Sequence, residues 1–432
     1  MGARDTFWRS TAIRRMIAGG DIGGIIRLAR QDRSWRQADL GRAAGYSAST
    51  ISRLENSRRA GVDVAKLRTV AALLTIPPEV IGALVSVPTP GSATVSGTTG
   101  ILAQEDPVHR RTFMATGLAI PAGLLSALDD TLALTPAPAR PPTPAAVAAR
   151  LARAQRQYDA GDHPGLIADL PDLIAGAQEA ALNSADAAVH ALAAACYDLA
   201  TEALNKIGRY SSSRITADRA VSFAARSGSP IAMATAARSL SIVLRHEDRP
   251  QLADRVALDA AGRLESAGLT TPQRLAVFAQ MLCTCSYNAA KAGSRDRALE
   301  LIADAERAAG RLPATAPPGQ PFVVTSAQVA LYKVGVHWSL GDAGAAVAAG
   351  GGLRPEQFGT AERRSRLHTD MARAWWQWGK YEEAASSLLA AWREAPAEVR
   401  DRPAIRKIAV GLVEKHPRVS GVRELATAVN HR

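Results

Sequence analysis

Apolar residues between positions 21 and 85 recur every three or four residues, the spacing that gathers them on one face of an α-helix. Pro77-Pro78 and the cluster around Gly45 interrupt this pattern. The pattern predicts five short helices, at 22–31, 37–44, 48–56, 64–74 and 78–85. On the first of them, the side chains expected to face the core are Ile22, Ile25, Ile26 and Leu28 or Ala29.

The predicted second and third helices are separated by a short turn that contains Gly45. Glycine adopts a positive φ without steric penalty, so it ends a helix and redirects the chain. Ser47 follows at a position where its hydroxyl can cap the next helix. Two short helices joined by such a turn form a helix-turn-helix, whose second helix enters the major groove of DNA.

The predicted third helix has two distinct faces. Ile51 and Leu54, three residues apart, hold it on the core. Small and polar side chains on the other face are candidates for contacts to bases: Ala48, Ser49, Thr50 and Arg53. An Ala or Thr methyl group suits the thymine methyl, and Arg suits guanine. Side chains near the helix ends are candidates for phosphate contacts: Gln37, Ser47, Asn56, Arg58 and Arg59. Helix capping is the alternative role for Gln37 and Ser47.

The remaining chain predicts a linker and a long helical region. Residues 87–145 are rich in Pro, Gly, Ser and Thr, and we expect a linker that contains one short apolar segment at 113–128. From 146 to 432, Ala- and Leu-rich helical patterns are broken by six short turns, centred on Gly161, Gly208, Asp248, Gly293, Gly341 and Gly379. Successive turns are 47, 40, 45, 48 and 38 residues apart, which indicates a repeated pair of helices.

Composition and charge agree with an all-α protein that binds a polyanion. Ala is abundant and aromatic residues make up only 5% of the chain, which favours helices over strands. The net charge is +12, and eight of these charges fall within residues 1–75. A positive field concentrated at one end of the chain favours a nucleic-acid partner.

Residues 7–86 resemble the Cro and phage-repressor-like family of regulators, called XRE. The resemblance rests on Arg30, on Gln37-Ala-Asp-Leu40 and on the run from Gly45 to Asn56. It implies a salt bridge between Arg30 of the first helix and Glu55 at the end of the third. Ala48 stands where this family commonly has Gln, so the base preferences of other members are not transferred. An actinobacterial subgroup of the family carries similar leading residues and C-terminal tetratricopeptide-like repeats.

The last helical pair, residues 371–391, resembles a tetratricopeptide repeat through its small residues, its Gly379-Lys-Tyr381 turn and Ala384. The resemblance implies an array of helical hairpins that binds a peptide or small-molecule effector, or a partner protein, and joins two chains into a homodimer. Aromatic side chains are candidates for the effector groove: Tyr210, Tyr287, Trp338 and Trp375. Packing within the repeat is the alternative role for the Trp cluster at 375–378.

The sequence contains no recognisable catalytic motif, so we expect no enzyme, no cofactor and no metal. Its three cysteines are too few for a disulfide framework, and we expect a cytoplasmic protein. A transcriptional regulator is the leading hypothesis. One alternative is a protein-binding scaffold with a vestigial DNA-binding domain. Another is a redox or metal sensor that uses Cys283 and Cys285.

The placement of the third helix gives a paired prediction. Arg53→Ala should cost about 1–3 kcal/mol at one base position and relax specificity there, because a base contact is lost. Arg58→Ala should weaken binding to all sequences alike and reduce the salt dependence of binding, because a phosphate contact is lost. Affinities for a set of single-base operator variants, measured at several salt concentrations, distinguish the two. Identical behaviour of the variants would show that the helix is misplaced.

Overall fold

The structure is a computed structural model, and every regular element in the part of the chain that it describes is a helix. The described residues are Trp8, Ile13, Met16, 21–46, Ile51, 54–55, 64–77, 120–134, 142–313 and 324–430. They contain no β-strand, which confirms the all-α expectation. The chain divides into two compact units, Met1–Thr116 and Gly117–Arg432. None of the described helices has both the length and the apolar character needed to cross a bilayer.

The N-terminal unit is built on α3 (Ile22–Asp32), α4 (Gln37–Ala44) and α6 (Val64–Leu73). These bounds agree with the sequence prediction to within one residue at each end. The predicted helix at 78–85 lies outside the described residues, as does the side chain of Ile22. The helices share a core that includes the expected inward-facing side chains, among them Ile25, Ile26, Ala29, Leu40, Ile51, Leu54, Val70 and Leu74.

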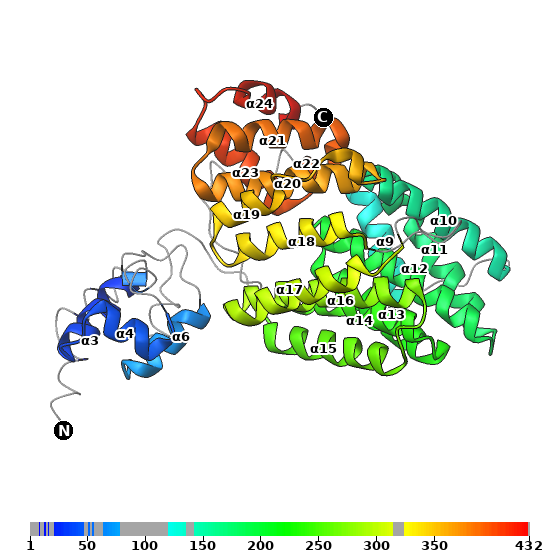
Figure 1. Cartoon of the computed structure of the whole chain (residues 1–432), viewed down its shortest axis with the longest axis horizontal. Helices are drawn as coiled ribbons and strands as arrows, with labels where there is room; N and C mark the ends of the chain where they lie inside the picture. Colours follow the sequence, from blue (N-terminus) through cyan, green and yellow to red (C-terminus); the bar gives the residue numbers. More distant parts are fainter. Residues whose placement is uncertain are drawn as a thin grey trace, which may run out of the picture. The chain divides into compact units, whose positions relative to one another are not determined.

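The C-terminal unit contains six helical hairpins among its described residues (Figure 1). The hairpins are α10 (Pro144–Ala160) with α11 (His163–Leu182), α12 (Ala187–Lys206) with α13 (Tyr210–Ser227), α14 (Pro230–His246) with α15 (Pro250–Ser266), α16 (Pro272–Lys291) with α17 (Arg295–Gly310), α18 (Ser326–Ser339) with α19 (Ala343–Gly350), and α20 (Ala361–Trp378) with α21 (Tyr381–Glu394). A 3₁₀ turn, η1 (Pro355–Gln357), precedes α20. Three shorter helices complete the unit: α22 (Pro396–Arg400), α23 (Pro403–Lys415) and α24 (Val422–Asn430).

All six turns predicted from the sequence lie between the two helices of a hairpin. Each has one residue in the left-handed conformation, with φ between 55° and 87°. In five turns this residue is glycine, and in the third it is Asp248, a residue type that tolerates this conformation. The left-handed residue turns the chain so that the N–H of the following residue donates to a carbonyl in the last turn of the helix. In the last turn, for example, the Lys380 N–H donates to the Trp375 carbonyl at 2.9 Å.

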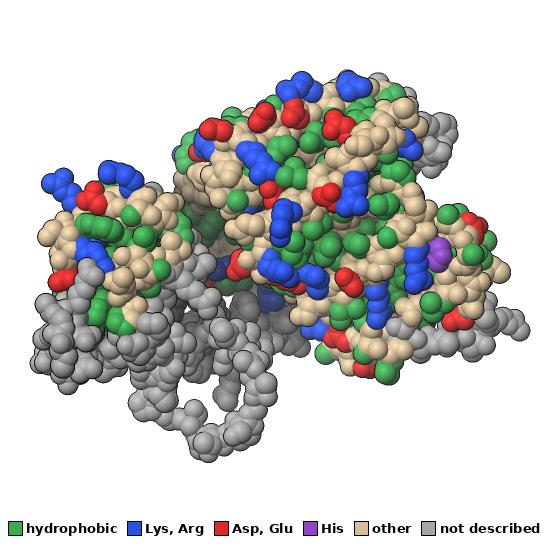
Figure 2. All heavy atoms as spheres, turned by 90° about the horizontal axis from the view of Figure 1, so that it is seen from below, with side chains coloured by type: hydrophobic (Ala, Val, Ile, Leu, Met, Phe, Trp, Pro, Cys, Tyr) green, Lys and Arg blue, Asp and Glu red, His purple; other side chains and the backbone are tan. Residues whose placement is uncertain are grey.

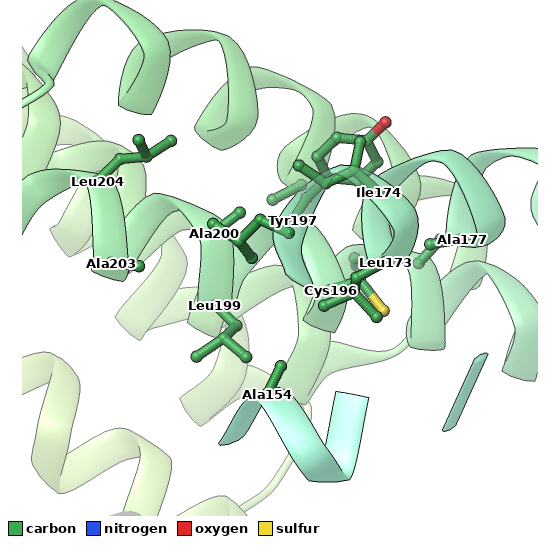
Figure 3. Packing of buried hydrophobic residues seen from close by; sticks show 14 of the residues in the cluster. Ala154, Leu173, Ile174, Ala177, Cys196, Tyr197, Leu199, Ala200, Ala203 and Leu204 are labelled. Atoms are coloured by element: carbon green, nitrogen blue, oxygen red, sulfur yellow. The ribbon is translucent and has the colours of Figure 1, made fainter. Parts of the chain in front are cut away.

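Small side chains let neighbouring hairpins pack closely. Figure 3 shows Ala154, Ala177 and Ala200 among Leu173, Leu199 and other larger side chains of one core cluster. The cluster also holds Tyr197, whose ring is fully buried. The Tyr197 hydroxyl donates to Oε1 of Gln178 at 2.7 Å, so this buried polar group is satisfied. Alanine therefore sets the distance between helices, and the larger residues fill the space that remains.

The C-terminal unit begins earlier than the sequence led us to expect. Residues 122–134 fall in the predicted linker, but they form helix α9 (Ala122–Leu134). Leu128 and Leu132 of α9 are buried in the same cluster as α11 and α12. Polar contacts also tie α9 to α13: Ser212 donates to Asp129 at 2.7 Å, and Arg219 donates to the Leu132 carbonyl at 2.8 Å. The part of the predicted apolar segment that the structure describes, residues 120–128, therefore belongs to the helical unit.

The first two hairpins of the array meet the last hairpin and α22 along a seam of buried charges. The Lys206 ammonium at the end of α12 contacts Glu398 of α22 and lies 2.5 Å from Oε1 of Glu362 in α20. The His163 ring at the start of α11 lies 3.2 Å from Oε1 of Glu398 and 3.4 Å from Oδ2 of Asp401. Figure 1 shows the teal helices at the start of the unit beside the orange helices near its end. The seam therefore closes the array on itself.

The seam predicts unequal effects of the same substitution in two turns. Gly379→Ala should cost about 1–2 kcal/mol, because alanine resists the left-handed conformation. Gly161→Ala should cost about 1–3 kcal/mol more, since the added Cβ would lie 2.8 Å from the Cβ of Ala395, beside α22. Nothing lies within 4 Å of the equivalent position at Gly379. Urea unfolding of both variants measures the difference, and equal losses would contradict the contact across the seam.

Candidate functional site

The end of α4 has the backbone conformation with which the turn of a helix-turn-helix begins. Gly45 ends α4 in the left-handed conformation, with φ 72° and ψ 26°. The Tyr46 N–H then donates to the Gly41 carbonyl at 2.7 Å, which gives a hydrogen-bond partner to a carbonyl in the last turn of α4. At the other end of α4, the Arg36 N–H donates to the Asp39 carboxylate at 2.9 Å. The chain is helical again at Ile51, whose side chain is fully buried.

A buried ion pair joins α3 to this second helical segment. The Arg30 guanidinium donates to both oxygens of Glu55, with Nε 2.5 Å from Oε1 and Nη2 2.9 Å from Oε2. The Glu55 side chain is 0% exposed and the Arg30 side chain is 10% exposed. Arg30 also donates to the Trp35 carbonyl at 2.6 Å. Bidentate Arg–carboxylate pairs fix the orientation as well as the distance of their partners.

Burial raises the pKa of the Glu55 carboxyl, but its hydrogen bonds outweigh that effect. Arg30 and Gln37 both donate to it, with Gln37 Nε2 2.9 Å from Oε2, and the charges of Arg30 and Arg27 act in the same direction. The pKa of Glu55 is therefore lower than usual, and the carboxylate stays ionised at neutral pH.

A glycine on α3 allows the two helical segments to approach closely. A Cβ at Gly23 would lie 2.5 Å from the Glu55 carbonyl oxygen and 2.9 Å from that of Leu54. The same Glu55 carbonyl accepts from Nη2 of Arg27 at 3.0 Å, one turn further along α3. The end of the third helix is thus held by backbone contact, by a hydrogen bond and by the ion pair.

A comparison with known families agrees with this geometry. Residues 21–84 match a family described as a helix-turn-helix domain. The N-terminal unit carries a helix-turn-helix DNA-binding domain. Among curated proteins, no relative of the chain was found.

Most of the predicted DNA-contacting residues of the helix-turn-helix domain lie outside the described residues. These are the base-contacting candidates Ala48, Ser49, Thr50 and Arg53, and the phosphate-contacting candidates Ser47, Asn56, Arg58 and Arg59. Gln37 is described, and its amide nitrogen donates to Glu55. The structure therefore gives Gln37 a role in positioning the ion pair, which the sequence did not suggest, and its phosphate contact stays a prediction.

Two exposed arginines were not among the sequence candidates. Arg36 lies immediately before α4, and Arg42 lies in its last turn with 82% of its side chain exposed. The first turn of a helix presents free N–H groups and the positive end of its dipole, so a cation beside it adds to an attraction for phosphate. The signal in the sequence was a basic residue directly before a predicted helix.

The four aromatic candidates for an effector groove do not lie together. Tyr210 and Tyr287 line a cavity of about 410 Å³ in the C-terminal unit. Trp338 lies beside that cavity, with the Arg373 guanidinium 3.5 Å from the centre of its ring. Trp375 does not line this cavity; its ring stacks on Trp378 at 5.7 Å between centres, and it lines a separate pocket beside Glu382 and Glu383. Two of the four aromatic candidates therefore line one cavity, and the part of all four in binding an effector stays a prediction.

The cysteines have the environment of core residues. Cys196, Cys283 and Cys285 are unpaired and buried in helices. Burial raises the pKa of the Cys196 and Cys285 thiols to about 12. Thiols are nucleophiles and metal ligands as thiolates, so these side chains are poorly suited to redox sensing or metal binding. The groups of His, Cys, Asp and Glu within the described ranges include none arranged to hold a metal ion.

The ion pair predicts a large and pH-dependent loss of stability for Glu55→Ala. Removing the carboxylate leaves the Arg30 guanidinium buried without its partner, which should destabilise the N-terminal unit by about 3–5 kcal/mol. Asp32→Ala is the matched control, since Asp32 is an exposed acid at the end of α3. This control should change stability by less than about 0.5 kcal/mol. The measurement is the free energy of unfolding of both variants at neutral pH. Equal values for the two variants would contradict a stabilising role of the ion pair.

The lowered pKa of Glu55 sets the direction of the pH dependence. The carboxylate contributes its stabilisation above the ordinary Glu value of 4.5, and this contribution is lost as the pH falls from there through the lower folded value. The difference in stability between wild type and Glu55→Ala should therefore shrink below pH 4.5. A constant difference through that range would mean that the Glu55 charge is not the stabilising group.

Proposed function

We propose that this protein is a sequence-specific transcriptional regulator of the XRE type. The observation that carries the proposal is the buried Arg30–Glu55 pair within the helix-turn-helix domain. These two residues occupy the positions at which that family places its salt bridge. A degenerate, protein-binding helix-turn-helix would have no need for the surplus of eight positive charges in residues 1–75.

The third helix of the domain reads bases in the major groove through Ala48, Ser49, Thr50 and Arg53. Phosphate contacts from the helix ends, with Arg36 and Arg42 in addition to the candidates named from the sequence, fix its register. The ion pair and the contact at Gly23 set the angle of this helix on α3, so they determine which of its side chains reach the groove.

The C-terminal unit serves as a tetratricopeptide-like sensor that controls DNA binding and pairs two chains. Its support is the succession of hairpins with left-handed turns, and a cavity large enough for an effector. Pairing is expected because a single helix-turn-helix makes few contacts, and two of them on a palindromic site double these. In this proposal the protein catalyses no reaction and acts in the cytoplasm.

Footprinting on the promoter region of its own gene tests the proposal. We expect protection of two half-sites whose centres are about 34–36 Å apart, or a multiple of that distance, because two domains bind one face of the duplex. Random DNA of equal length is the control. Equal affinity for both at physiological salt, with no protected site, would reject the regulator and favour a scaffold with a vestigial DNA-binding domain.

A further inference from the structure

The cavity of the C-terminal unit has more positive than negative charge. Its wall comes from the first helices of successive hairpins, α12, α14, α16, α18 and α20, together with residues near α10, α13 and α23. Eight Lys and Arg side chains line it, against four Asp and Glu. The seam of Lys206 and Glu362 forms part of the same wall. The inner surface of the hairpins thus forms a partly open cavity with a surplus of positive charge.

Arg245 is a cation in this wall for which the described residues supply no carboxylate partner. Its Nη1 donates to Oδ1 of Asn288 at 2.8 Å, and its guanidinium lies 4.6 Å from the centre of the Tyr287 ring. Asn288 is buried and held in turn by Ser241, to which it donates at 3.0 Å. A guanidinium has five N–H groups, and this one is fixed in place with only one of the five bonded within the described residues.

A second cation approaches Tyr287 from the opposite side of the cavity. Arg373 Nη2 lies 3.5 Å from the Tyr287 hydroxyl, and the Arg373 guanidinium rests on the Trp338 ring. Its carboxylate partner, Asp370, is shared with Arg366, at 3.2 Å and 2.7 Å respectively. One carboxylate therefore serves two guanidinium groups, which leaves one positive charge in excess.

The local pKa values agree with this excess. Burial would raise the pKa of the Tyr287 hydroxyl, but Arg373 and Arg245 outweigh it and lower that pKa. Burial lowers the pKa of His246 to about 4, and Arg245, Lys291 and Arg373 contribute in the same direction. Nearby positive charges lower the pKa of a tyrosine and of a histidine alike, so both shifts agree with an excess of cations in the cavity.

One outer face of the helical unit carries side chains of both charges. Figure 2 shows Lys and Arg side chains interspersed with Asp and Glu over the helical unit. Some surface cations have an acid on a neighbouring helix, as in Arg297–Asp254 at 2.8 Å and Lys333–Glu306 at 2.9 Å. Arg245 is held inside the cavity by Asn288 and Tyr287 with no carboxylate among the described residues, so an anion that enters the cavity would supply the missing negative charge.

We infer that the cavity binds a small organic phosphate, held by Arg245 and Arg373 on either side of Tyr287. The volume of about 410 Å³ lies in the lower part of the range for small-molecule pockets, so it suits a ligand of nucleotide size. A phosphate group carries close to two negative charges near pH 7 and accepts from several N–H groups, which matches two guanidinium groups better than a monocarboxylate does. The inference rests on the proposed role of the C-terminal unit as the sensor.

Calorimetric titration of the full-length protein at 0.15 M salt tests this site. The probes are pyrophosphate and adenosine monophosphate, with adenosine and citrate as controls. Pyrophosphate and adenosine monophosphate should bind once per chain, and adenosine at least about tenfold more weakly. Arg245→Gln should raise the dissociation constants of the phosphate probes at least about tenfold, since a charged hydrogen bond is lost. Arg263→Gln, an exposed arginine on α15, is the matched control and should bind like wild type.

The melting temperature of the ligand-free variants separates loss of the site from loss of the fold. Arg245→Gln removes an uncompensated charge, so it should melt no lower than Arg263→Gln. Arg373→Gln provides a second test of the same phosphate contact. The inference is overturned if no phosphate probe binds at millimolar concentration, if Arg245→Gln and Arg263→Gln bind alike, or if citrate binds as well as pyrophosphate. Because footprinting of DNA is independent of these titrations, failure here would leave the proposed DNA-binding function standing.

Discussion

A charge removed from water must be compensated within hydrogen-bond distance, and this constraint governs both units of the protein. In the N-terminal unit it fixes Arg30 to Glu55, whose side chain is 0% exposed, so the third helix has one orientation on α3. In the C-terminal unit it fixes Lys206 and His163 to Glu398, which is also 0% exposed. Such pairs add less to stability than to the choice of one geometry, because desolvation consumes much of their attraction. The Arg30–Glu55 pair and the cluster of Lys206, His163 and Glu398 each join helices that are not neighbours in the sequence.

The seam determines the cavity. Left-handed turns and alanine contacts build each hairpin locally, but they do not decide whether the array ends as an open groove or closes. Lys206, Glu362, Glu398 and His163 bring the first two hairpins against the last hairpin and α22, and the inner helices with their surplus of cations then line a partly open cavity. The same constraint that explains the seam then points to an anion at Arg245, where the described residues provide no counter-charge.

Local features were predictable from the sequence and long-range ones were not. The bounds of α3 and α4, the positive φ of Gly45 and the six hairpin turns each depend on residues within one or two helical turns of each other. The Arg30–Glu55 pairing came from a family resemblance. The seam joins His163 to a residue 235 positions away, and the packing of α9 on α11 depends on a surface formed by other helices. The surroundings of the effector candidates were likewise not predictable: Tyr210 and Tyr287 line the cavity and Trp375 stacks on Trp378, because of how helices distant in the sequence pack together.

The central claim is that the N-terminal unit recognises a DNA sequence in the cell. Genome-wide mapping of the sites occupied by the full-length protein, beside the Arg53→Ala variant, tests it most directly. The account predicts a limited set of sites that share a motif of two half-sites, and a loss of information at one motif position in the variant. Occupancy that follows only DNA accessibility, with no shared motif and no difference between the two proteins, would contradict it.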